Sequence, residues 1–462
     1  MAERTSFLRS VGVVGAIGVA VAGMAPTLAL NLNPQNLAEH VGAAVPLVFA
    51  LATVAITLVA WCFARLSRID PSSGSAYTQV TASLGPRAGI VAGWALLGAY
   101  ACFGAVNVSG MAIFASSVLD SFGIWADPNP DVIAVAATAI VIVLSLAPVH
   151  RVTMALLVVE LTSVACMLAL SVFVLSRVDF SAIDIGTGDL FWPAGGVAPS
   201  AIALALAFAV LSFAGFEEAA TLGEEATHPE RQIPIALIVT AIGGGLLFVV
   251  VTAAEVYGIY DRVDGMQAFE ASPGLIQTLG DRYIGAGAGD AMELFAVASA
   301  LAAGLSVVVA TTRMLLALTR DLAPELPFAR VSDDGGAPRV GIVAIAGASL
   351  AAYLALRVFA GASAQDVFFW SGSTSALLIV VAYLLVAVGA GRVMLANRGL
   401  GLLELAIPVI AVAILVYTLG ASVYPQGEGA YAVIPYVVLG WLALAVVAPL
   451  LRPGMLARVG SS

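Results

Sequence analysis

The sequence predicts an all-α polytopic membrane protein. Of its 462 residues, 61% are hydrophobic and only 10% are charged, whereas soluble domains carry about 25% charged residues. The apolar residues gather into twelve runs, most of them near the length of about 20 that a helix needs to cross the hydrocarbon core. Two of these runs are interrupted by residues that break helices. The pattern therefore indicates twelve transmembrane helices, with helices 1 and 6 discontinuous.

The predicted spans follow directly from the apolar runs. They cover residues 11–30, 43–64, 89–119, 132–149, 154–175, 199–222, 235–256, 291–318, 340–356, 367–388, 402–419 and 430–451. The third run is long enough that its helix must tilt or extend beyond the bilayer.

The distribution of basic residues predicts the orientation. All 19 basic residues are arginine, and basic residues favour the cytoplasmic side of a membrane protein. With the N-terminus inside, only Arg177, Arg262, Arg282 and Arg357 fall on the outer side, which leaves 15 of the 19 inside. We therefore expect a multi-pass protein of the cytoplasmic (plasma) membrane, a cell inner membrane, with both termini cytoplasmic.

Several functional classes are not supported. The net charge of −10 argues against binding nucleic acid. No catalytic triad, phosphate-binding loop or dinucleotide motif occurs, so we expect neither an enzyme nor a bound cofactor. Cys62, Cys102 and Cys166 have the spacing of neither a disulfide framework nor a metal site. The longest outer connections, 176–198 and 257–290, each have room for a short amphipathic helix but not for a soluble domain.

The two interruptions predict a binding site. The first span contains Gly23, Met24, Ala25 and Pro26, and the sixth contains Ala214 followed by Gly215. Broken helices at corresponding positions in two halves of a chain indicate the binding site of a transporter, because unwound backbone at membrane depth is tolerated where it lines a cavity. The alternative is that Pro26 only kinks its helix. The candidate binding residues at the two breaks are Gly23, Met24, Ala25, Pro26, Thr27, Phe213, Ala214, Gly215 and Phe216.

Two carboxylates follow the second interruption. An ionised side chain at a helix centre costs on the order of 3 kcal/mol on insertion scales, so Glu217 and Glu218 call for a reason. We interpret Glu217 as a proton carrier or as the partner of a substrate ammonium group. The alternative is that it lies in cytoplasmic water. Glu218 is expected to be structural, since neighbouring helical residues point about 100° apart. Glu160, near the inner end of span 5, is expected to be a satisfied helix-end carboxylate, with Arg151 or Arg313 as a candidate partner. The alternative is a role in a gate.

Three stretches resemble the amino acid–polyamine–organocation superfamily of secondary transporters. The second stretch, with Phe213, Gly215 and Glu217 followed by the segment up to Pro234, is the most specific. The three stretches are 71–80, 213–234 and 313–327, and the resemblance runs from about residue 10 to about residue 450.

The resemblance implies a single transmembrane domain over residues 1–462. It consists of two inverted five-helix repeats, 11–175 and 199–388, and two additional helices in 402–451. Substrate is then held between the breaks, with walls from helices 3, 8 and 10, and Asn107 and Trp370 are further candidates there. Carriers of the family often have Gly-small-Gly at the first break. Here Met24 is bulky and Pro26 has no N–H, so both a carboxylate and an amine substrate stay open.

The resemblance also bears on gating and coupling. Glu225 and Arg320 are candidates for a cytoplasmic gate, although charges at helix ends are often only solvated. Sodium-coupled relatives use hydroxyls of helix 8, where this chain offers Ser306 alone, and some proton-coupled relatives use a lysine, which this chain lacks. This favours proton coupling through Glu217, or simple exchange, over sodium symport.

The sequence thus predicts a permease that moves amino acids or related amines by alternating access. The alternatives are a polyamine or organic-cation transporter and a ligand sensor that does not transport. The expected partners are a small-molecule substrate, the lipid bilayer and a proton, with no metal and no nucleic acid. The sequence leaves the oligomeric state open.

Overall fold

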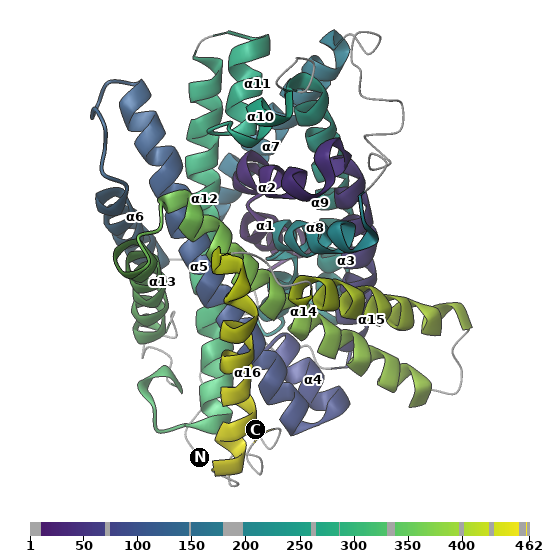
Figure 1. Ribbon diagram of the computed structural model, residues 1–462. Coiled ribbons are helices and arrows are strands. Elements are labelled where there is room, and N and C mark those ends of the chain that lie inside the picture. The colour runs from purple at the N-terminus through teal and green to yellow at the C-terminus, as the bar shows by residue number, and fades with distance from the viewer. Residues whose placement is uncertain are drawn as a thin grey trace.

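The computed structural model describes residues 11–69, 74–146, 149–178, 197–259, 265–285, 287–329, 338–396, 402–424, 429–451 and 459. Within these residues every regular element is a helix (Figure 1). The prediction of an all-helical membrane protein is therefore confirmed for this part of the chain. Residues 71–73 of the first motif, both chain ends and most of the 176–198 connection lie outside it.

The helices follow the predicted apolar runs. In the first half they are α1 (Val13–Met24), α2 (Pro26–Val41), η1 (Gly42–Ala44), α3 (Val45–Ser67), α4 (Ala76–Leu84), α5 (Pro86–Ser121), α6 (Pro130–Leu146) and α7 (Val149–Arg177). In the second half they are α8 (Pro199–Ser212), η2 (Phe216–Leu222), α9 (Pro229–Ile259), α10 (Gly265–Glu270), α11 (Leu275–Tyr283), α12 (Ala288–Leu322), η3 (Pro327–Ala329), α13 (Arg339–Phe359) and α14 (Ala364–Ala396). The chain ends with α15 (Leu402–Val423), η4 (Gly429–Ala432) and α16 (Ile434–Leu451).

Within the described residues, nine helical segments are long and apolar enough to cross a membrane. The first of them, Val13–Ser67, covers two predicted spans, and the bent pair of α8 and η2 gives a tenth crossing if it is counted as one. Helix α6 is apolar but shorter, with 17 residues. The third predicted span is a helix of 36 residues, which at 1.5 Å per residue is far longer than the hydrocarbon is thick.

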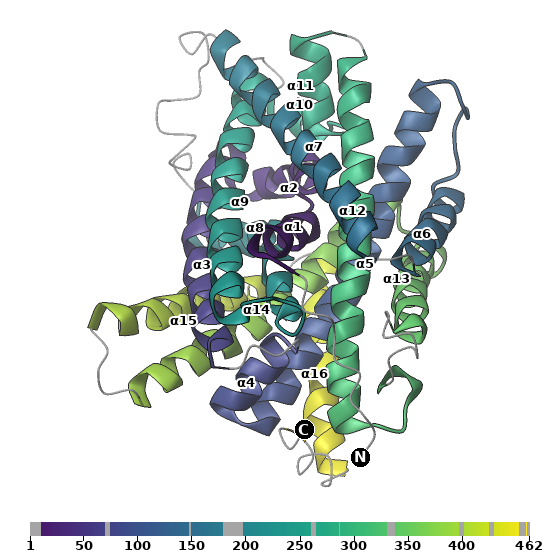
Figure 2. The same ribbon diagram turned by 180° about the vertical axis from the view of Figure 1, so that it is seen from behind.

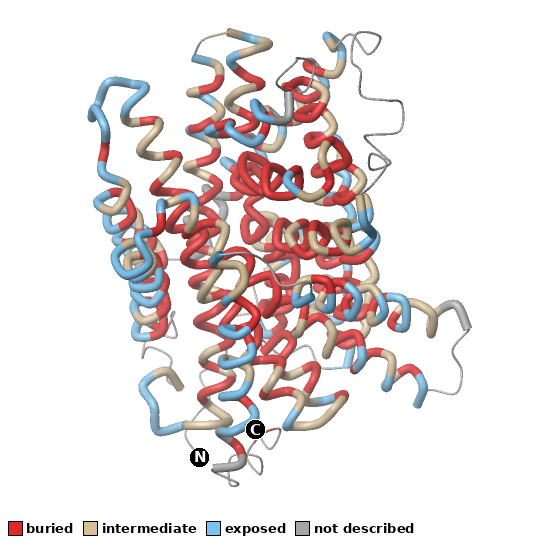
Figure 3. The backbone as a smooth tube through the Cα atoms, in the orientation of Figure 1, coloured by how far each residue is buried: buried red, intermediate tan, exposed pale blue. Residues whose placement is uncertain are grey.

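Each of the first four predicted spans packs against the span five places further on. Helix α1 contacts η2 and α2 contacts α8, α3 runs along α9, α5 along α12, and α6 along α13 (Figures 1 and 2). These contacts bring the two interrupted spans together in the middle of the molecule. Figure 3 shows that the helices of this middle region are the most completely buried, whereas α6, α13, α15 and α16 expose more of their surface.

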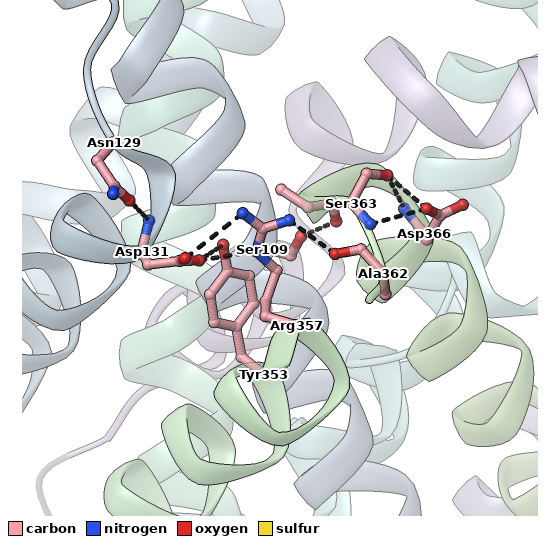
Figure 4. Close-up of polar contacts among 9 residues, drawn as sticks. Ser109, Asn129, Asp131, Tyr353, Arg357, Ala362, Ser363 and Asp366 are labelled. Carbon is pink, nitrogen blue, oxygen red and sulfur yellow. Dashed lines mark hydrogen bonds and ion pairs between the residues drawn. The ribbon is translucent and has the colours of Figure 1, made fainter. Parts of the chain in front are cut away.

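Helices α6 and α13 are joined by a polar contact at one end (Figure 4). The Arg357 guanidinium lies 2.7 Å from the Asp131 carboxylate. The Tyr353 hydroxyl donates to the same carboxylate at 3.1 Å, and Arg357 also donates to the Ala362 carbonyl at 2.7 Å. Because several donors converge on one acidic side chain, the contact fixes how α6 lies on α13.

The connection between residues 257 and 290 contains two short helices, α10 and α11, as its amphipathic pattern predicts. Helix α11 contacts α12, α2, α7 and α9. The side-chain oxygen of Asn31 in α2 accepts a hydrogen bond of 3.1 Å from the Ile276 backbone N–H. Helix α11 is therefore attached directly to the second half of the first broken span.

Candidate functional site

The first break lies between α1 and α2. Helix α1 ends at Met24, and Ala25 adopts a left-handed conformation with φ 44° and ψ 58°. Pro26 then begins α2, where its fixed φ suits the first helical position and its missing N–H costs nothing. A left-handed alanine costs roughly 1–2 kcal/mol, so the surrounding packing must hold this conformation in place.

The second break lies between α8 and η2. Helix α8 ends at Ser212, and Gly215 has φ 107°, a backbone conformation that side-chain-bearing residues avoid. The chain then continues as a tighter 3-10 helix, bent by 42° from α8. A glycine at position 215 is therefore needed for the turn itself.

The two breaks are in direct contact. A β-carbon on Gly215 would lie 2.6 Å from the Met24 backbone nitrogen and 2.7 Å from the Gly23 carbonyl oxygen. A β-carbon on Gly23 would lie 2.6 Å from the Glu218 carboxylate. All three distances are shorter than real carbon contacts. The missing side chain at Gly215 therefore allows the two backbones to meet, and the missing side chain at Gly23 leaves room for the Glu218 carboxylate.

Glu217 is fully buried beside this contact. One carboxylate oxygen accepts a hydrogen bond of 3.0 Å from the Tyr100 hydroxyl of α5. The other accepts bonds of 2.7 Å from the Tyr383 hydroxyl of α14 and 3.1 Å from the Gly215 N–H. The alternative that Glu217 lies in cytoplasmic water is therefore wrong, and its carboxylate links α5 and α14 to the second break.

Glu218 is also fully buried but faces different helices. Its carboxylate accepts a hydrogen bond from Ser306 of α12, whose hydroxyl also lies 3.2 Å from the Val19 carbonyl of α1. Its other oxygen has no hydrogen-bond partner among the described residues. Because helices surround η2, the side chain of Glu217 points toward α5 and α14 and that of Glu218 points toward α12, and both are buried.

A third buried carboxylate, Glu160 of α7, lies near the start of α2. It accepts a hydrogen bond of 2.9 Å from Ser299, and the Ser299 oxygen accepts one of 3.4 Å from the Leu28 N–H. The hydroxyls of Thr27 and Ser163 also share a hydrogen bond. Of the two candidate partners, Arg313 contacts Glu225 instead, and the side chain of Arg151 lies outside the part of the chain that the structure describes.

A cavity of about 10 Å³ lies beside the first break, and we call it the central cavity. Its volume is roughly that of one water probe, so it has no room for an amino acid or an amine in this structure. Its lining residues are Met24, Ala25, Leu28, Ala29, Asn33, Phe103, Val106, Leu211 and Phe368.

The structure brings most of the predicted site residues together but not all. Met24 and Ala25 line the central cavity, and Gly23, Pro26 and Thr27 adjoin it in the chain. At the second break, the segment 213–216 is entirely buried against them.

Two predicted residues do not line the central cavity. Asn107 donates a hydrogen bond of 3.0 Å to the Phe103 carbonyl, and its β-carbon faces Gly304 of α12. Trp370 is half-buried in apolar packing and is not among the residues that line the cavity. Phe103 and Phe368, on the same helices, line it instead.

Sequence reasoning overlooked the two tyrosines that contact Glu217. Tyr100 and Tyr383 are both fully buried, and each lies in the middle of an apolar run. A buried tyrosine usually needs a hydrogen-bond partner for its hydroxyl. A tyrosine in the middle of an apolar run therefore indicates a polar partner on a neighbouring helix, and this was the signal in the sequence.

One of the two predicted gate residues, Glu225, forms an ion pair. Arg313 of α12, not Arg320, contacts Glu225, with 2.8 Å between the Arg313 Nε and a carboxylate oxygen. Both side chains are largely buried, with exposed fractions of 9% and 15%. The backbone of Glu225 also accepts a hydrogen bond of 3.0 Å from the Val11 N–H. The ion pair therefore joins the segment after η2 to α12. The backbone hydrogen bond joins the same segment to the start of the described chain.

The fold and site define a multi-pass membrane protein in which two broken helices meet around buried carboxylates. The chain belongs to the amino acid permease family, whose sequence profile matches residues 15–437.

Curated relatives carry transporter names. The chain is 26% identical over 312 residues to the low-affinity putrescine importer PlaP of Escherichia coli, a match that covers 67% of this chain and 66% of the importer. It is 26% identical over 322 residues to the branched-chain amino acid permease BcaP of Lactococcus lactis, covering 66% of this chain and 67% of that permease. A vacuolar cationic amino acid transporter 2 of Arabidopsis thaliana is 27% identical over 248 residues, 50% of this chain and 36% of the transporter.

Proposed function

We propose that the protein is a secondary transporter that moves an amino acid or a related amine across a membrane by alternating access. The observation that carries the proposal is the contact between the two helix breaks, Gly215 against Gly23 and Met24, with carboxylates on either side. Broken helices place free backbone groups where a substrate binds. Membership of the permease family and the names of the relatives support a transporter rather than an enzyme.

The proposed topology has twelve spans, with two inverted five-helix repeats over 11–175 and 199–388 and two additional helices over 402–451. The packing of each early span on its counterpart five places later supports this arrangement. With 15 arginines inside, both termini are cytoplasmic and the protein resides in the cytoplasmic membrane. Alternating access then moves one repeat against the other around the central cavity.

A second candidate function is transport of a cationic amine that has no carboxylate. At the start of α2, Pro26 has no N–H and the Leu28 N–H already donates to Ser299, so fewer amides are available for a substrate carboxylate. Glu218 retains a carboxylate oxygen without a partner among the described residues. One relative is named as a putrescine importer, and putrescine is a diamine. These observations favour an amine over a simple amino acid.

The proposed coupling uses a proton at Glu217. Its carboxylate holds three hydrogen-bond donors, and hydrogen bonds to a charged group are stronger than those to a neutral one. Protonation therefore weakens the link between the second break and α5 and α14, the helices that also line the central cavity. We propose Glu225, with Arg313 as its partner, as the inner gate. Exchange of one substrate for another is the alternative to net proton coupling.

Uptake into proteoliposomes tests this function. The purified protein is reconstituted and supplied with radiolabelled amino acids and amines under an imposed pH gradient, an imposed sodium gradient or neither. We expect accumulation of one substrate class that responds to pH and not to sodium. Binding of a ligand without any uptake or counterflow would show a sensor instead of a transporter, and uptake that requires sodium would contradict the proton-coupling proposal.

A further inference from the structure

A second cavity lies between α2, α8, α14, α15 and the start of α16. Its volume is about 170 Å³, somewhat more than an apolar protein cavity of ~150 Å³ that accommodates benzene. We call it the lateral cavity. It is bordered by three helices that also border the central cavity, but the two share no lining residue. It has room for a molecule with roughly six to eight non-hydrogen atoms.

Three rings from three different elements line the lateral cavity. His40 of α2 stacks on Phe208 of α8 with 5.7 Å between ring centroids and 10° between planes. Tyr431 of η4 meets Phe208 edge-on at 6.3 Å. The Tyr431 hydroxyl accepts a long hydrogen bond of 3.5 Å from Asn36. All three rings are half-buried, so part of each ring surface is left for a ligand.

One acidic side chain lines the lateral cavity, and two others lie near its lining residues. Glu39 of α2 lines it, and Glu270 of α10 lies close enough to interact with Glu39 electrostatically. Glu39 and Asp366 of α14 both lie close enough to the Tyr431 hydroxyl to interact with it electrostatically. The cavity therefore combines aromatic faces with a negative potential, and this combination attracts an organic cation.

We propose that the lateral cavity binds a small protonated amine with a short apolar chain. The ammonium group lies between Glu39 and the rings of Phe208 and Tyr431, and the chain packs on the apolar side chains of α8 and α14. Helices α2 and α8 belong to the two broken spans, and α14 to α16 form the opposite wall. A bound amine thus holds the broken spans against α14 to α16 and slows their movement. This proposal does not depend on which substrate the central site takes.

Isothermal titration of the full-length protein with n-butylammonium tests the proposal. Butan-1-ol has nearly the same shape without the charge, and we expect it to bind at least tenfold more weakly. Tyr431→Leu and Glu39→Gln are each expected to weaken binding of n-butylammonium about tenfold, in line with the loss of one cation–π or charge contact. Tyr431→Phe keeps the ring and should retain most of the affinity. Equal binding of the alcohol, or unchanged affinity in both Tyr431→Leu and Glu39→Gln, would overturn the proposal.

A pair of variants, one in each cavity, distinguishes binding in the lateral cavity from binding in the central cavity. Glu39 is exposed, so Glu39→Gln is expected to fold and carries the test if Tyr431→Leu does not. Leu211→Phe narrows the central cavity and should leave binding of n-butylammonium intact. If Leu211→Phe abolishes binding while Glu39→Gln has no effect, the amine occupies the central site and the lateral assignment is wrong.

The ammonium group has two possible sources, a free amine or the headgroup of phosphatidylethanolamine. In nanodiscs of phosphatidylglycerol and an uncharged glycolipid we expect full affinity for n-butylammonium. The comparison discs keep the same fraction of phosphatidylglycerol, so that the surface charge is unchanged, and contain phosphatidylethanolamine in place of the glycolipid. Weaker affinity in these discs identifies the lipid headgroup as a natural occupant, and equal affinity identifies a free amine. Absence of binding in both kinds of disc contradicts the proposal.

Discussion

The Tyr383 hydroxyl donates a hydrogen bond of 2.7 Å to Glu217 from a position 166 residues further along the chain. Tyr100 donates to the same carboxylate at 3.0 Å from the other side. Phe63 and Phe216 pack edge-on against the Tyr383 ring, at 5.7 and 5.5 Å between centroids. The carboxylate is therefore the point at which the second break, α5 and α14 are joined, and loss of its charge would weaken all three hydrogen bonds.

Replacement of Tyr383 by phenylalanine tests this junction. The change removes one donor from a buried carboxylate and keeps the ring, so we expect a loss of roughly 1–3 kcal/mol in the free energy of unfolding. Because the carboxylate loses a stabilising partner, we also expect the pH profile of uptake to shift toward higher pH. The measurements are denaturant unfolding in detergent and uptake at a series of pH values.

Tyr353→Phe is the matched control. Tyr353 is also a buried tyrosine that donates to a carboxylate, in this case Asp131, but it lies between α6 and α13. Tyr353→Phe should lower the free energy of unfolding without shifting the pH profile of uptake. An equal shift of the profile in both variants would mean that Glu217 is not the group that titrates.

Gly215→Ala tests the contact between the breaks. A β-carbon there meets the backbone of Gly23 and Met24 and requires a left-handed alanine, so we expect uptake to fall more than tenfold. The comparison variant is Gly243→Ala in α9, where a β-carbon has nothing within 4 Å and alanine favours the helix by up to about 1 kcal/mol. Normal uptake by Gly215→Ala would show that the breaks need not touch.

A double-mutant cycle measures the contact between Gly23 and Glu218. Gly23→Ala places a β-carbon 2.6 Å from the Glu218 carboxylate and should be destabilising. Glu218→Ala removes the obstructing group, so the double variant should be more stable than the sum of the single changes predicts, by about 0.5–3 kcal/mol. Glu218→Gln keeps the shape and should give no such relief. Additive stabilities in the cycle with Glu218→Ala would show that the two positions are independent.

The inner ion pair predicts a change in accessibility. In a variant without Cys62, Cys102 and Cys166, a cysteine at Thr221 reports on the inner half of the second broken span. Arg313→Gln removes the partner of Glu225 and should increase labelling of that cysteine from the inner side several-fold. Arg320→Gln should have a smaller effect. A larger effect of Arg320→Gln would show that Arg320, and not Arg313, is the arginine that controls access.

Hydropathy predicted the helices well because the bilayer fixes how long an apolar helix must be. Each predicted run overlaps one of the helices, and both interruptions are found near Pro26 and Gly215. These features depend on local chemistry, namely the missing N–H of proline and the freedom of glycine. They can therefore be inferred without knowing which helices are neighbours.

The side chains around the breaks were harder to predict, because they depend on how each helix is rotated about its axis. Asn107 is central in its span but faces α12, and Phe103, one turn earlier, faces the cavity. Arg313 and Arg320 are on the same helix, and only the packing shows that Glu225 reaches Arg313. Hydrophobicity along the chain does not contain this rotational information.

Uptake by wild-type protein, Gly215→Ala and Gly243→Ala, compared side by side in proteoliposomes with the same labelled substrate, tests most directly whether substrate crosses at the contact between the breaks. The account predicts accumulation above protein-free vesicles for the wild type and for Gly243→Ala, and little or none for Gly215→Ala. Equal accumulation by all three proteins, or no accumulation by a wild-type protein that still binds the substrate, would contradict it.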